Sequence, residues 1–435
     1  MISAPAPPHV AVVGPGTRFL SGVTCYTFVL CNRLSESCIV SAILMRRLLP
    51  ARLYPGRERV GAPLSDLSLL PAVRRYDGVD WFWGVTMARA LIFLARQRPD
   101  VLLLQWWTGT VLHTYLALAL TARLLGIRVV VEVHEALDPG EDRLRLVNRY
   151  VGAVAPWLFR LAAGYVVHSA HDRDLVAARY GTAGPGKPVE IIPFATWDHY
   201  RGPNRVRLAP EGCCNLLFFG LIRPYKGLDT LIRAFDSIQP EEIDRYWLTV
   251  VGETWEGWTE PMELVERSPY RDRISVDNRY VTDREVGAYF NGADVVVLPY
   301  HRSCGSGALH VALNHGLPVV VTPMEALVEA VDGYGGAVVA AEATPPALLE
   351  AIRGAAGLRG RRFADPRPWS DIPRRYHDFF ARLDGASDDR RQENSPRSRA
   401  SNPRRRRADA GKTPATRSRT CVSRVTRVTR EGAAR

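Results

Sequence analysis

Short apolar runs recur along the chain, and most are followed by a segment with helical periodicity. In the first half these runs are 9–14, 100–105, 128–134, 164–169 and 189–194. In the second half they are 215–220, 247–252, 273–278, 294–299, 317–322 and 336–341. Uninterrupted apolar runs are typical of strands buried on both faces, which occur in parallel sheets covered by helices. The pattern therefore predicts an α/β fold.

A polar segment rich in Pro and Gly, at 198–213, interrupts this alternation and is typical of a linker. A chain of 435 residues is also too long for one core. We therefore predict two doubly wound, Rossmann-like domains, at 1–200 and 201–365. Such sheets bind ligands at the carboxyl ends of their strands, so a cleft between the domains is the expected site.

The net charge of +12 is concentrated at the end of the chain. Residues 386–435 hold 15 Arg and Lys against 5 Asp and Glu, so the other 385 residues carry only +2. The 386–435 segment has few apolar residues, which predicts a disordered basic tail. It is either a solvated extension or a contact for an anionic partner. No nucleic acid is expected to bind the folded part.

The seven Cys form no CxxC pair and no Cys/His ligand set, which favours a reduced, cytoplasmic protein without a structural metal or cofactor. No signal peptide is evident at the start of the chain. Charged residues or Pro interrupt the apolar segments 112–133 and 151–167, so neither is a convincing membrane span.

The stretch CGSGALH at 304–310 follows an expected strand and opens an expected helix. Ser306 can cap that helix, while Gly305 and Gly307 allow a ligand to approach the backbone closely. A helix N-terminus at the carboxyl end of a strand suits an anion, because its free N–H groups and its dipole face outward. An ordinary capped helix is the alternative.

A second loop, RPYKG, follows the expected strand that ends at Gly220. Its two cations, Arg223 and Lys226, suit a diphosphate, which Arg binds bidentately and Lys binds as a point charge. The alternative is two solvated surface cations. Both anion signals fall in the same predicted domain and at the same end of its sheet, which favours the diphosphate.

The first predicted domain offers fewer chemical groups. His134 and Glu135 follow the run at 128–134 and could position hydroxyl groups or move protons, although a lone His is more often structural. Gly14 and Gly16 fail the GxGxxG pattern because Phe19 takes the last position, which argues against a dehydrogenase. Gly22 remains a point of close backbone approach.

Several segments together resemble the glycosyltransferase family 4 group of GT-B enzymes, over about residues 9–383. FLSGVTCYT is similar to the family's glycine loop, RVVVEVHE to its VVVTVHD segment, and FFGLIRPYKG to its GRLxxxKG motif. ADVVVLPY and GLPVVVT also match its patterns. The resemblance implies two Rossmann-like domains facing a cleft, with a helix at 366–385 that crosses back to the first domain. Its apolar stripe is Ile372, Tyr376, Phe379, Phe380 and Leu383.

The resemblance also implies a function: transfer of a sugar from a nucleoside-diphosphate sugar to an acceptor, with retention at the anomeric carbon. The donor would bind the second domain, where Gly220, Arg223, Lys226 and the Ser306 loop would hold its diphosphate. The acceptor would bind the first domain near Gly22, Gln105, Trp106 and His134. The catalytic residues implied are His134, Arg223 and Lys226.

One departure concerns two Glu, with seven residues between them, that the family often has just before GxPVV. Those positions hold Ser303 and Val311 here. The first Glu commonly contacts the donor sugar, so Ser303 is the corresponding candidate. The missing Glu pair keeps alternatives open: a non-catalytic GT-B protein that binds sugar or lipid, or another enzyme such as a nucleotide-sugar epimerase.

The segment 44–61 mixes Arg with Leu and Tyr. We predict either contact with the anionic inner face of a membrane, where a lipid-linked acceptor would be found, or a surface loop whose Arg stems cover apolar atoms. The expected location is cytoplasmic, with peripheral membrane association under the first alternative.

Overall fold

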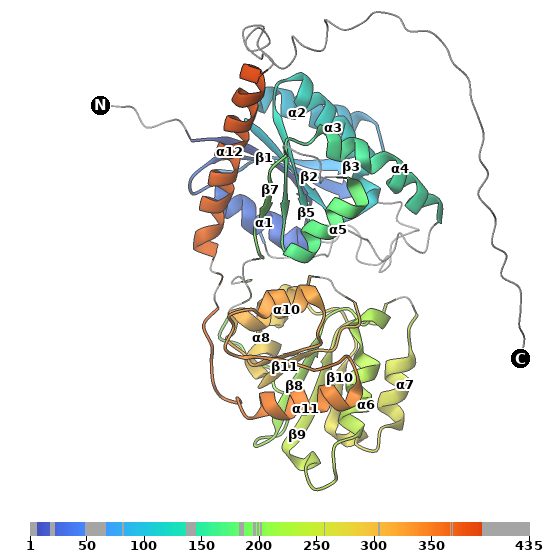
Figure 1. The fold of residues 1–435 in the computed structure, drawn as a ribbon. Helices are drawn as coiled ribbons and strands as arrows, with labels where there is room; N and C mark the ends of the chain where they lie inside the picture. The colour runs from blue at the N-terminus through green and yellow to red at the C-terminus, as the bar shows by residue number, and fades with distance from the viewer. Residues whose placement is uncertain are drawn as a thin grey trace, which may run out of the picture. The chain divides into compact units, whose positions relative to one another are not determined.

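The computed structural model describes residues 7–17, 22–47, 67–80, 82–135, 145–181, 187–194, 197, 200, 202–255, 257–302, 305–365, 367 and 369–393 (Figure 1). Within these ranges the chain forms two parallel sheets with helices between most successive strands. The predicted α/β class is therefore confirmed.

The first sheet has the strand order β3-β2-β1-β4-β5-β6-β7, with parallel pairing throughout. Its strands are β1 (His9–Pro15), β2 (Ile39–Arg47), β3 (Arg74–Asp80), β4 (Val101–Trp106), β5 (Arg128–Val133), β6 (Gly164–Val167) and β7 (Val189–Ile191). The helices are α1 (Gly22–Leu34), α2 (Val85–Gln97), α3 (Leu112–Leu124), α4 (Arg145–Leu161) and α5 (Ala170–Tyr180).

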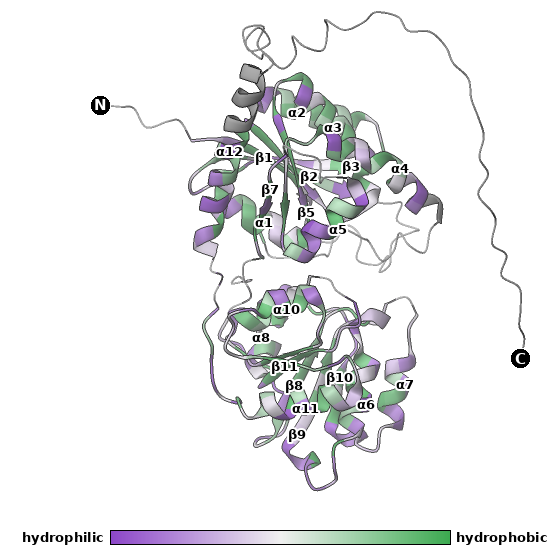
Figure 2. Ribbon diagram, in the orientation of Figure 1, coloured by the Kyte–Doolittle hydropathy of each residue, from purple (hydrophilic) through white to green (hydrophobic). Residues whose placement is uncertain are grey.

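The second sheet has the order β10-β9-β8-β11-β12-β13, again parallel. Its strands are β8 (Cys214–Phe219), β9 (Tyr246–Val251), β10 (Ile274–Asp277), β11 (Val295–Leu298), β12 (Val319–Val321) and β13 (Ala337–Val339). The helices are α6 (Leu228–Asp236), α7 (Glu260–Arg267), α8 (Asp283–Gly292), α9 (Gly307–Asn314), α10 (Glu325–Val331) and α11 (Pro345–Ala356). Figure 2 shows that the central strands of both sheets are predominantly hydrophobic, as burial on both faces requires.

Each sheet reverses its strand order at one point. In the first sheet the reversal lies between β1 and β4, and in the second between β8 and β11. Ligands of doubly wound sheets bind at the carboxyl ends of the strands beside such a switch point. The loops that follow these four strands are therefore where a site is expected.

Local signals explain several helix boundaries. Ser169 caps α5 by accepting a hydrogen bond from the Asp172 amide, and Gly181 ends the helix in the left-handed region, with φ of 64°. A capping box joins Thr282 and Glu285 at the start of α8.

Three elements of the first half, β3, α2 and α4, are absent from the sequence-based expectations. The sequence of β3, RRYDGVD, contains no continuous apolar run, and its first half is largely exposed. This strand lies at the sheet edge, where one side has no neighbouring strand to bury it. The apolar-run criterion that finds central strands therefore misses it.

The last helix, α12 (Ile372–Glu393), packs against the first sheet, as predicted (Figure 1). The whole predicted stripe is buried, and it shares one core cluster with α1 and with apolar residues of the central strands. The strand residues of this cluster include Val10, Leu103, Val130 and Val166. Gly164 of β6 lies directly under the helix: a Cβ atom there would come 2.9 Å from both Phe379 and Leu383. Close packing of α12 therefore requires glycine at this position.

Some predictions reach beyond the described residues. α12 continues to Glu393, past the predicted helix end at 385, while 394–435 of the predicted tail lie outside the described residues. So do Ser303 and residues 48–61 of the Arg-rich segment. The predicted boundary at 200/201 falls between the end of β7 and the start of β8, but as a domain boundary it stays a prediction.

Candidate functional site

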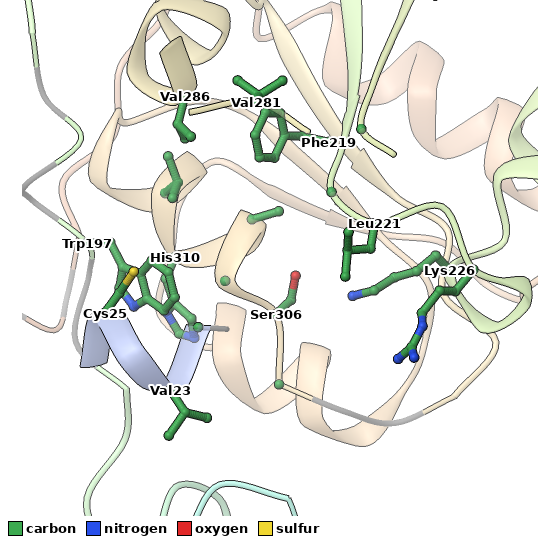
Figure 3. A pocket seen from close by; sticks show the side chains of 18 of the residues that line it. Val23, Cys25, Trp197, Phe219, Leu221, Lys226, Val281, Val286, Ser306 and His310 are labelled. Atoms are coloured by element: carbon green, nitrogen blue, oxygen red, sulfur yellow. The ribbon is translucent and has the colours of Figure 1, made fainter. Parts of the chain in front are cut away.

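One pocket, with a cavity volume of about 440 Å³, is lined by residues that follow the switch-point strands of both sheets (Figure 3). Gly22 to Cys25 of α1 and Trp107 after β4 come from the first sheet. The second sheet contributes the loop after β8 and the segment before α9. The sequence-based expectation of a site at these strand ends thus coincides with an actual cavity.

The segment before α9 forms a capped helix start in the pocket wall. The Ser306 hydroxyl accepts a hydrogen bond from the Leu309 amide at 3.3 Å, and it lies 2.8 Å from the hydroxyl of Tyr300. Gly305, Ser306 and Gly307 all line the pocket. The helix dipole and the amide groups at this end favour an anion.

The predicted pair of cations lies in the same pocket. Gly220 ends the strand segment with φ of 126°, and Pro224–Lys226 form a single 3-10 turn. The Lys226 ammonium lies 3.8 Å from the ring centre of Tyr300, and the Arg223 guanidinium lies 5.2 Å from that of Trp255. Cation–π contacts of this kind restrict both side chains to the pocket wall.

Trp197 is a pocket residue that the sequence analysis does not identify. Its ring packs between the starts of two helices from different sheets: a Cβ at Gly22 would lie 2.9 Å from it, and a Cβ at Gly307 would lie 3.1 Å from it. The sequence suggests both glycines as points of ligand approach. In the structure, the Trp197 ring itself requires glycine at Gly22 and leaves little room for a side chain at Gly307.

Two predicted acceptor residues lie behind the pocket rather than in its wall. Gln105 is fully buried, and Trp106 is packed against Phe159 and Tyr180. Side chains alternate between the two faces of β4, so both are covered by the layers beside the sheet. Trp107, the first residue after the strand, is the tryptophan that lines the pocket.

His134 and Glu135 follow β5 and both line the pocket. Glu135 is exposed, whereas His134 is buried with both ring nitrogens engaged by the protein. Its Nε2 contacts the Gln105 amide, and its Nδ1 lies 3.1 Å from Nε2 of His168. Burial lowers the pKa of His134 well below its ordinary value.

Glu132, His134 and His168 are the described residues whose ligand atoms come close enough together to hold a metal ion, within 4.8 Å of one another. These atoms are also engaged in hydrogen bonds: Oε1 of Glu132 accepts from Tyr376, and the two imidazoles face each other. The group therefore forms a hydrogen-bonded network without any ion.

His310, on the second turn of α9, is also missed by the sequence analysis. It is 4% exposed, it lines the pocket, and its Nδ1 atom has no hydrogen-bond partner among the described residues. Burial lowers the pKa of His310 to about 3, so the ring is neutral at pH 7. In the view of Figure 3, His310 lies with Trp197 and Cys25 at one end of the pocket wall, and Lys226 lies toward the other.

The family often has Glu at two positions, which hold Ser303 and Val311 here, and only Val311 lies in the described part of the chain. The Val311 side chain is buried, and it lines the pocket next to His310. The described part of this wall therefore presents an apolar group and a neutral imidazole where many family members have a carboxylate.

Comparison with known proteins assigns both halves of the chain. Residues 21–195 match the glycosyl transferase 4-like domain, and residues 213–356 match glycosyl transferases group 1. A GDP-mannose:glycolipid 4-beta-D-mannosyltransferase of Xanthomonas campestris pv. campestris is 35% identical over 106 residues. That match covers 24% of this chain and only 29% of the relative's length.

Solved structures agree on the fold. A glycosyltransferase from Rickettsia africae ESF-5 superposes with a TM-score of 0.60 at 10% identity, covering 86% of this chain and 98% of the other. Anabaena HepE, solved with UDP and glucose, superposes with a TM-score of 0.56 at 14% identity, covering 86% and 99%. The chain therefore belongs to the group 1 glycosyltransferases of the family 4 type, and it has the GT-B fold.

Proposed function

We propose that the pocket binds a nucleoside-diphosphate sugar and that the protein transfers the sugar to an acceptor. The observation that carries this proposal is the convergence of Arg223, Lys226 and the Ser306-capped start of α9 on one cavity. Two cations and a helix N-terminus together match the charge of a diphosphate. The donor of the Xanthomonas relative is GDP-mannose, and HepE was solved with UDP, so nucleotides of both kinds are the candidates.

In this proposal the donor lies with its diphosphate against the second sheet. Arg223, Lys226 and the α9 amides stabilise the negative charge that develops on the leaving diphosphate as the glycosidic bond breaks. Because these groups are held in place before the reaction, no reorganisation is needed in the transition state. Gly220 and Gly305 line the same wall and leave the backbone accessible beside the diphosphate.

The acceptor side is assigned to residues of the first sheet that line the pocket, chiefly Trp107 and Glu135. An indole can stack on a sugar face, and an exposed carboxylate can accept hydrogen bonds from hydroxyl groups. Retention at the anomeric carbon is the predicted outcome. It is checked by NMR of the anomeric proton in the first product formed.

We further propose that the acceptor is lipid-linked and that the helices α2, α3 and α4 meet an anionic membrane surface. Their sequences contain six Arg and no Asp or Glu. On α2, the exposed residues Val85, Arg89, Ile92 and Arg96 follow one another at helical spacing. The Xanthomonas relative is named for a glycolipid acceptor, which supports a lipid-linked acceptor for this protein as well.

The other two helices repeat this pairing of apolar and basic residues. On α4, Trp157 is 61% exposed, with the Arg160 guanidinium 5.4 Å from its ring centre. On α3, Leu124 is 88% exposed and follows Arg123. Proteins dock at a membrane interface when their apolar side chains enter the headgroup region and neighbouring Arg side chains bind lipid phosphates. No helix of the described residues is long and apolar enough to cross a bilayer.

The donor assignment is tested by binding and turnover of GDP-, UDP- and ADP-sugars. We expect Lys226→Ala to slow donor hydrolysis and transfer by about 100-fold, and Arg223→Ala to act in the same direction. Arg233→Ala is the matched control, because Arg233 is exposed on α6 and paired with Glu260 outside the pocket. If none of these donors binds the wild type, the assignment is wrong.

If a donor binds but is neither hydrolysed nor transferred with any acceptor, the protein is a non-catalytic sugar-binding GT-B protein. Interconversion of the free donor without transfer would instead identify an epimerase. Both outcomes contradict the proposed transfer.

The membrane surface is tested by flotation with vesicles of phosphatidylcholine alone or mixed with phosphatidylglycerol. We expect binding to the anionic vesicles only, and its loss in the double variant Ile92→Ser, Trp157→Ser. Leu208→Ser, at a 40% exposed residue before β8, is the control. Equal flotation with both vesicle types would contradict an electrostatic contribution.

A further inference from the structure

Two neighbouring strands of the second sheet, β8 and β9, continue their pairing into the loops that follow them. The Ile222 amide donates a hydrogen bond to the Glu253 carbonyl at 2.9 Å, and the Trp255 amide donates one to the Ile222 carbonyl at 3.0 Å. Between these bonds, Ile222 and Thr254 form a parallel bridge. The loop after β9 is therefore fixed beside the loop that carries Arg223.

This pairing also orients the side chain of Glu253. The indole Nε1–H of Trp255 donates a hydrogen bond to Oε2 of Glu253 at 2.8 Å, and the centre of the same indole ring lies 5.2 Å from the Arg223 guanidinium. All three residues line the pocket. A carboxylate is thus held in the pocket wall next to one of the cations that the proposed function assigns to the diphosphate.

A carboxylate at this place does not suit the diphosphate itself, because the two negative charges repel each other. It suits a group that donates hydrogen bonds, since an ionised carboxylate only accepts them and each of its oxygens accepts more than one. Glu253 can therefore accept from a ligand while it keeps the bond from Trp255. In a nucleoside-diphosphate sugar, hydroxyl donors flank the diphosphate on both sides: the ribose on one and the transferred sugar on the other.

The direction in which the donor lies follows from the proposed acceptor site. The transferred sugar must face the acceptor, which the proposed function assigns to Trp107 and Glu135 after strands of the first sheet. The ribose then lies on the other side of the diphosphate, over the second sheet. The second sheet's half of the chain also supplies Phe219, Val281 and Val286, which belong to one apolar cluster and line the pocket (Figure 3). Such an apolar wall suits the nucleobase that the ribose carries.

Two other carboxylates of the described residues line the pocket, those of Glu135 and Asp283. Glu135 follows β5 and lies on the acceptor side. Asp283, at the start of α8, accepts a hydrogen bond from the Tyr200 hydroxyl at 3.4 Å, and this hydroxyl lies 3.5 Å from Sγ of Cys25 on α1. The contacts of Asp283 thus lead toward the first sheet, whereas those of Glu253 lead to the proposed diphosphate site.

We propose that Glu253 accepts hydrogen bonds from the ribose hydroxyl groups of the bound donor and makes the pocket selective for ribonucleotides. Trp255 acts as a positioning residue: its N–H group limits the rotation of the carboxylate, so less side-chain freedom is lost when the ribose binds. The inference rests on the proposed function, because it requires a nucleoside diphosphate in this pocket.

The ribose contact is tested by calorimetry of the full-length protein with GDP, UDP and their 2′-deoxy and 3′-deoxy forms. For the nucleotide that binds, we expect loss of the contacting hydroxyl to weaken binding to the wild type by about tenfold, as for a hydrogen bond to a charged group. In Glu253→Gln this discrimination should largely disappear: the amide oxygen can accept from Trp255, but the NH₂ group cannot accept from ribose. Glu263→Gln is the matched control and should keep the wild-type discrimination, because Glu263 is exposed on α7 and pairs with Arg267 outside the pocket.

Inorganic pyrophosphate, which has no ribose, separates this role from a role at the diphosphate. Glu253→Gln should lose none of its affinity for pyrophosphate. Equal losses of affinity for pyrophosphate, the ribonucleotide and the deoxynucleotides would mean that Glu253 only holds Arg223 in place, and would overturn the proposal. Unchanged discrimination in Glu253→Gln would also overturn it, as would loss of discrimination in Asp283→Asn or Glu135→Gln instead.

Failure of the proposed donor gives a different result from failure of the ribose contact. If neither GDP nor UDP binds the wild type, the donor assignment is wrong, and the ribose contact is wrong with it. If one of them binds and its deoxy forms bind equally well, the donor assignment stands and the ribose contact alone is wrong. If Glu253→Gln does not fold, Glu253→Asp serves instead: its shorter side chain keeps the charge but withdraws the carboxylate, so the discrimination should again fall.

Discussion

His310 shows how a single buried side chain can oppose stability where a ligand is expected. Its Nδ1 atom is buried without a hydrogen-bond partner among the described residues, and its pKa is lowered to about 3 by burial. A buried polar group without a hydrogen bond lowers stability by about 1–3 kcal/mol, whereas a well-fitting apolar side chain at the same place has no such cost. A bound nucleotide sugar compensates for this cost if one of its hydroxyl groups donates a hydrogen bond to Nδ1.

We therefore expect His310→Leu to raise the free energy of unfolding at pH 7 by about 1 kcal/mol and to weaken donor binding. The gain should grow as the pH falls. The unfolded imidazole takes up a proton below about 6.5 while the folded one does not, so the wild type loses up to about 1.4 kcal/mol per pH unit through this residue, and the variant does not. Urea unfolding at pH 5 and pH 7 measures both effects.

His377→Leu is the matched control, since His377 is exposed on α12. Equal pH dependence in wild type and His310→Leu would mean that the folded state accommodates a charged His310. Unchanged affinity of His310→Leu for the nucleotide sugar would mean that His310 does not contact the bound donor.

At the scale of elements, α12 is the clearest case of a helix whose stability depends on its packing. Phe379 is fully buried in the core cluster formed with the first sheet, and its ring lies over Gly164. We expect Phe379→Ala to lower the free energy of unfolding by about 3–5 kcal/mol, because it leaves a cavity above β6. Asp378→Ala, on the exposed side of the same helix, should change it by less than about 0.5 kcal/mol. Equal effects in denaturant unfolding would mean that α12 contributes no packing energy.

The same helix shows how far sequence reasoning reaches. The spacing of Ile372, Tyr376 and Phe379 is enough to predict a helix with one buried face. Ser306 and Lys226 are also identifiable, because capping residues and cations in a short loop are local signals. The hydrogen bond from Tyr376 to Glu132 cannot be predicted in this way, since it joins residues from distant parts of the chain. Trp197 is missed for the same reason.

At the scale of the whole molecule, Trp197 connects elements of both sheets. It follows β7 in the chain, and its ring touches the start of α1 from the first sheet and the start of α9 from the second. Asn314 of α9 also donates a hydrogen bond to its backbone carbonyl, at 3.1 Å. Both helix starts line the pocket, so we expect the position of this ring to influence the spacing of the two walls.

Glycine at position 307 has two possible reasons: the Trp197 ring leaves no room for a side chain, or a ligand must approach the backbone there. A double-mutant cycle distinguishes the two. If the Trp197 ring requires glycine there, Gly307→Ala should lower the free energy of unfolding by about 1–3 kcal/mol without any ligand, because the new methyl group would lie 3.1 Å from the ring. The cost should shrink in a Trp197→Phe background, whose smaller ring leaves room, giving a coupling of at least about 0.5 kcal/mol. Gly257→Ala has open space at its Cβ and is the steric control, although its φ of 68° adds backbone strain that the Trp197→Phe background should not relieve. If Gly307→Ala instead weakens nucleotide binding while the cycle shows no coupling, the glycine serves the ligand, and Trp197 does not set the width of the pocket.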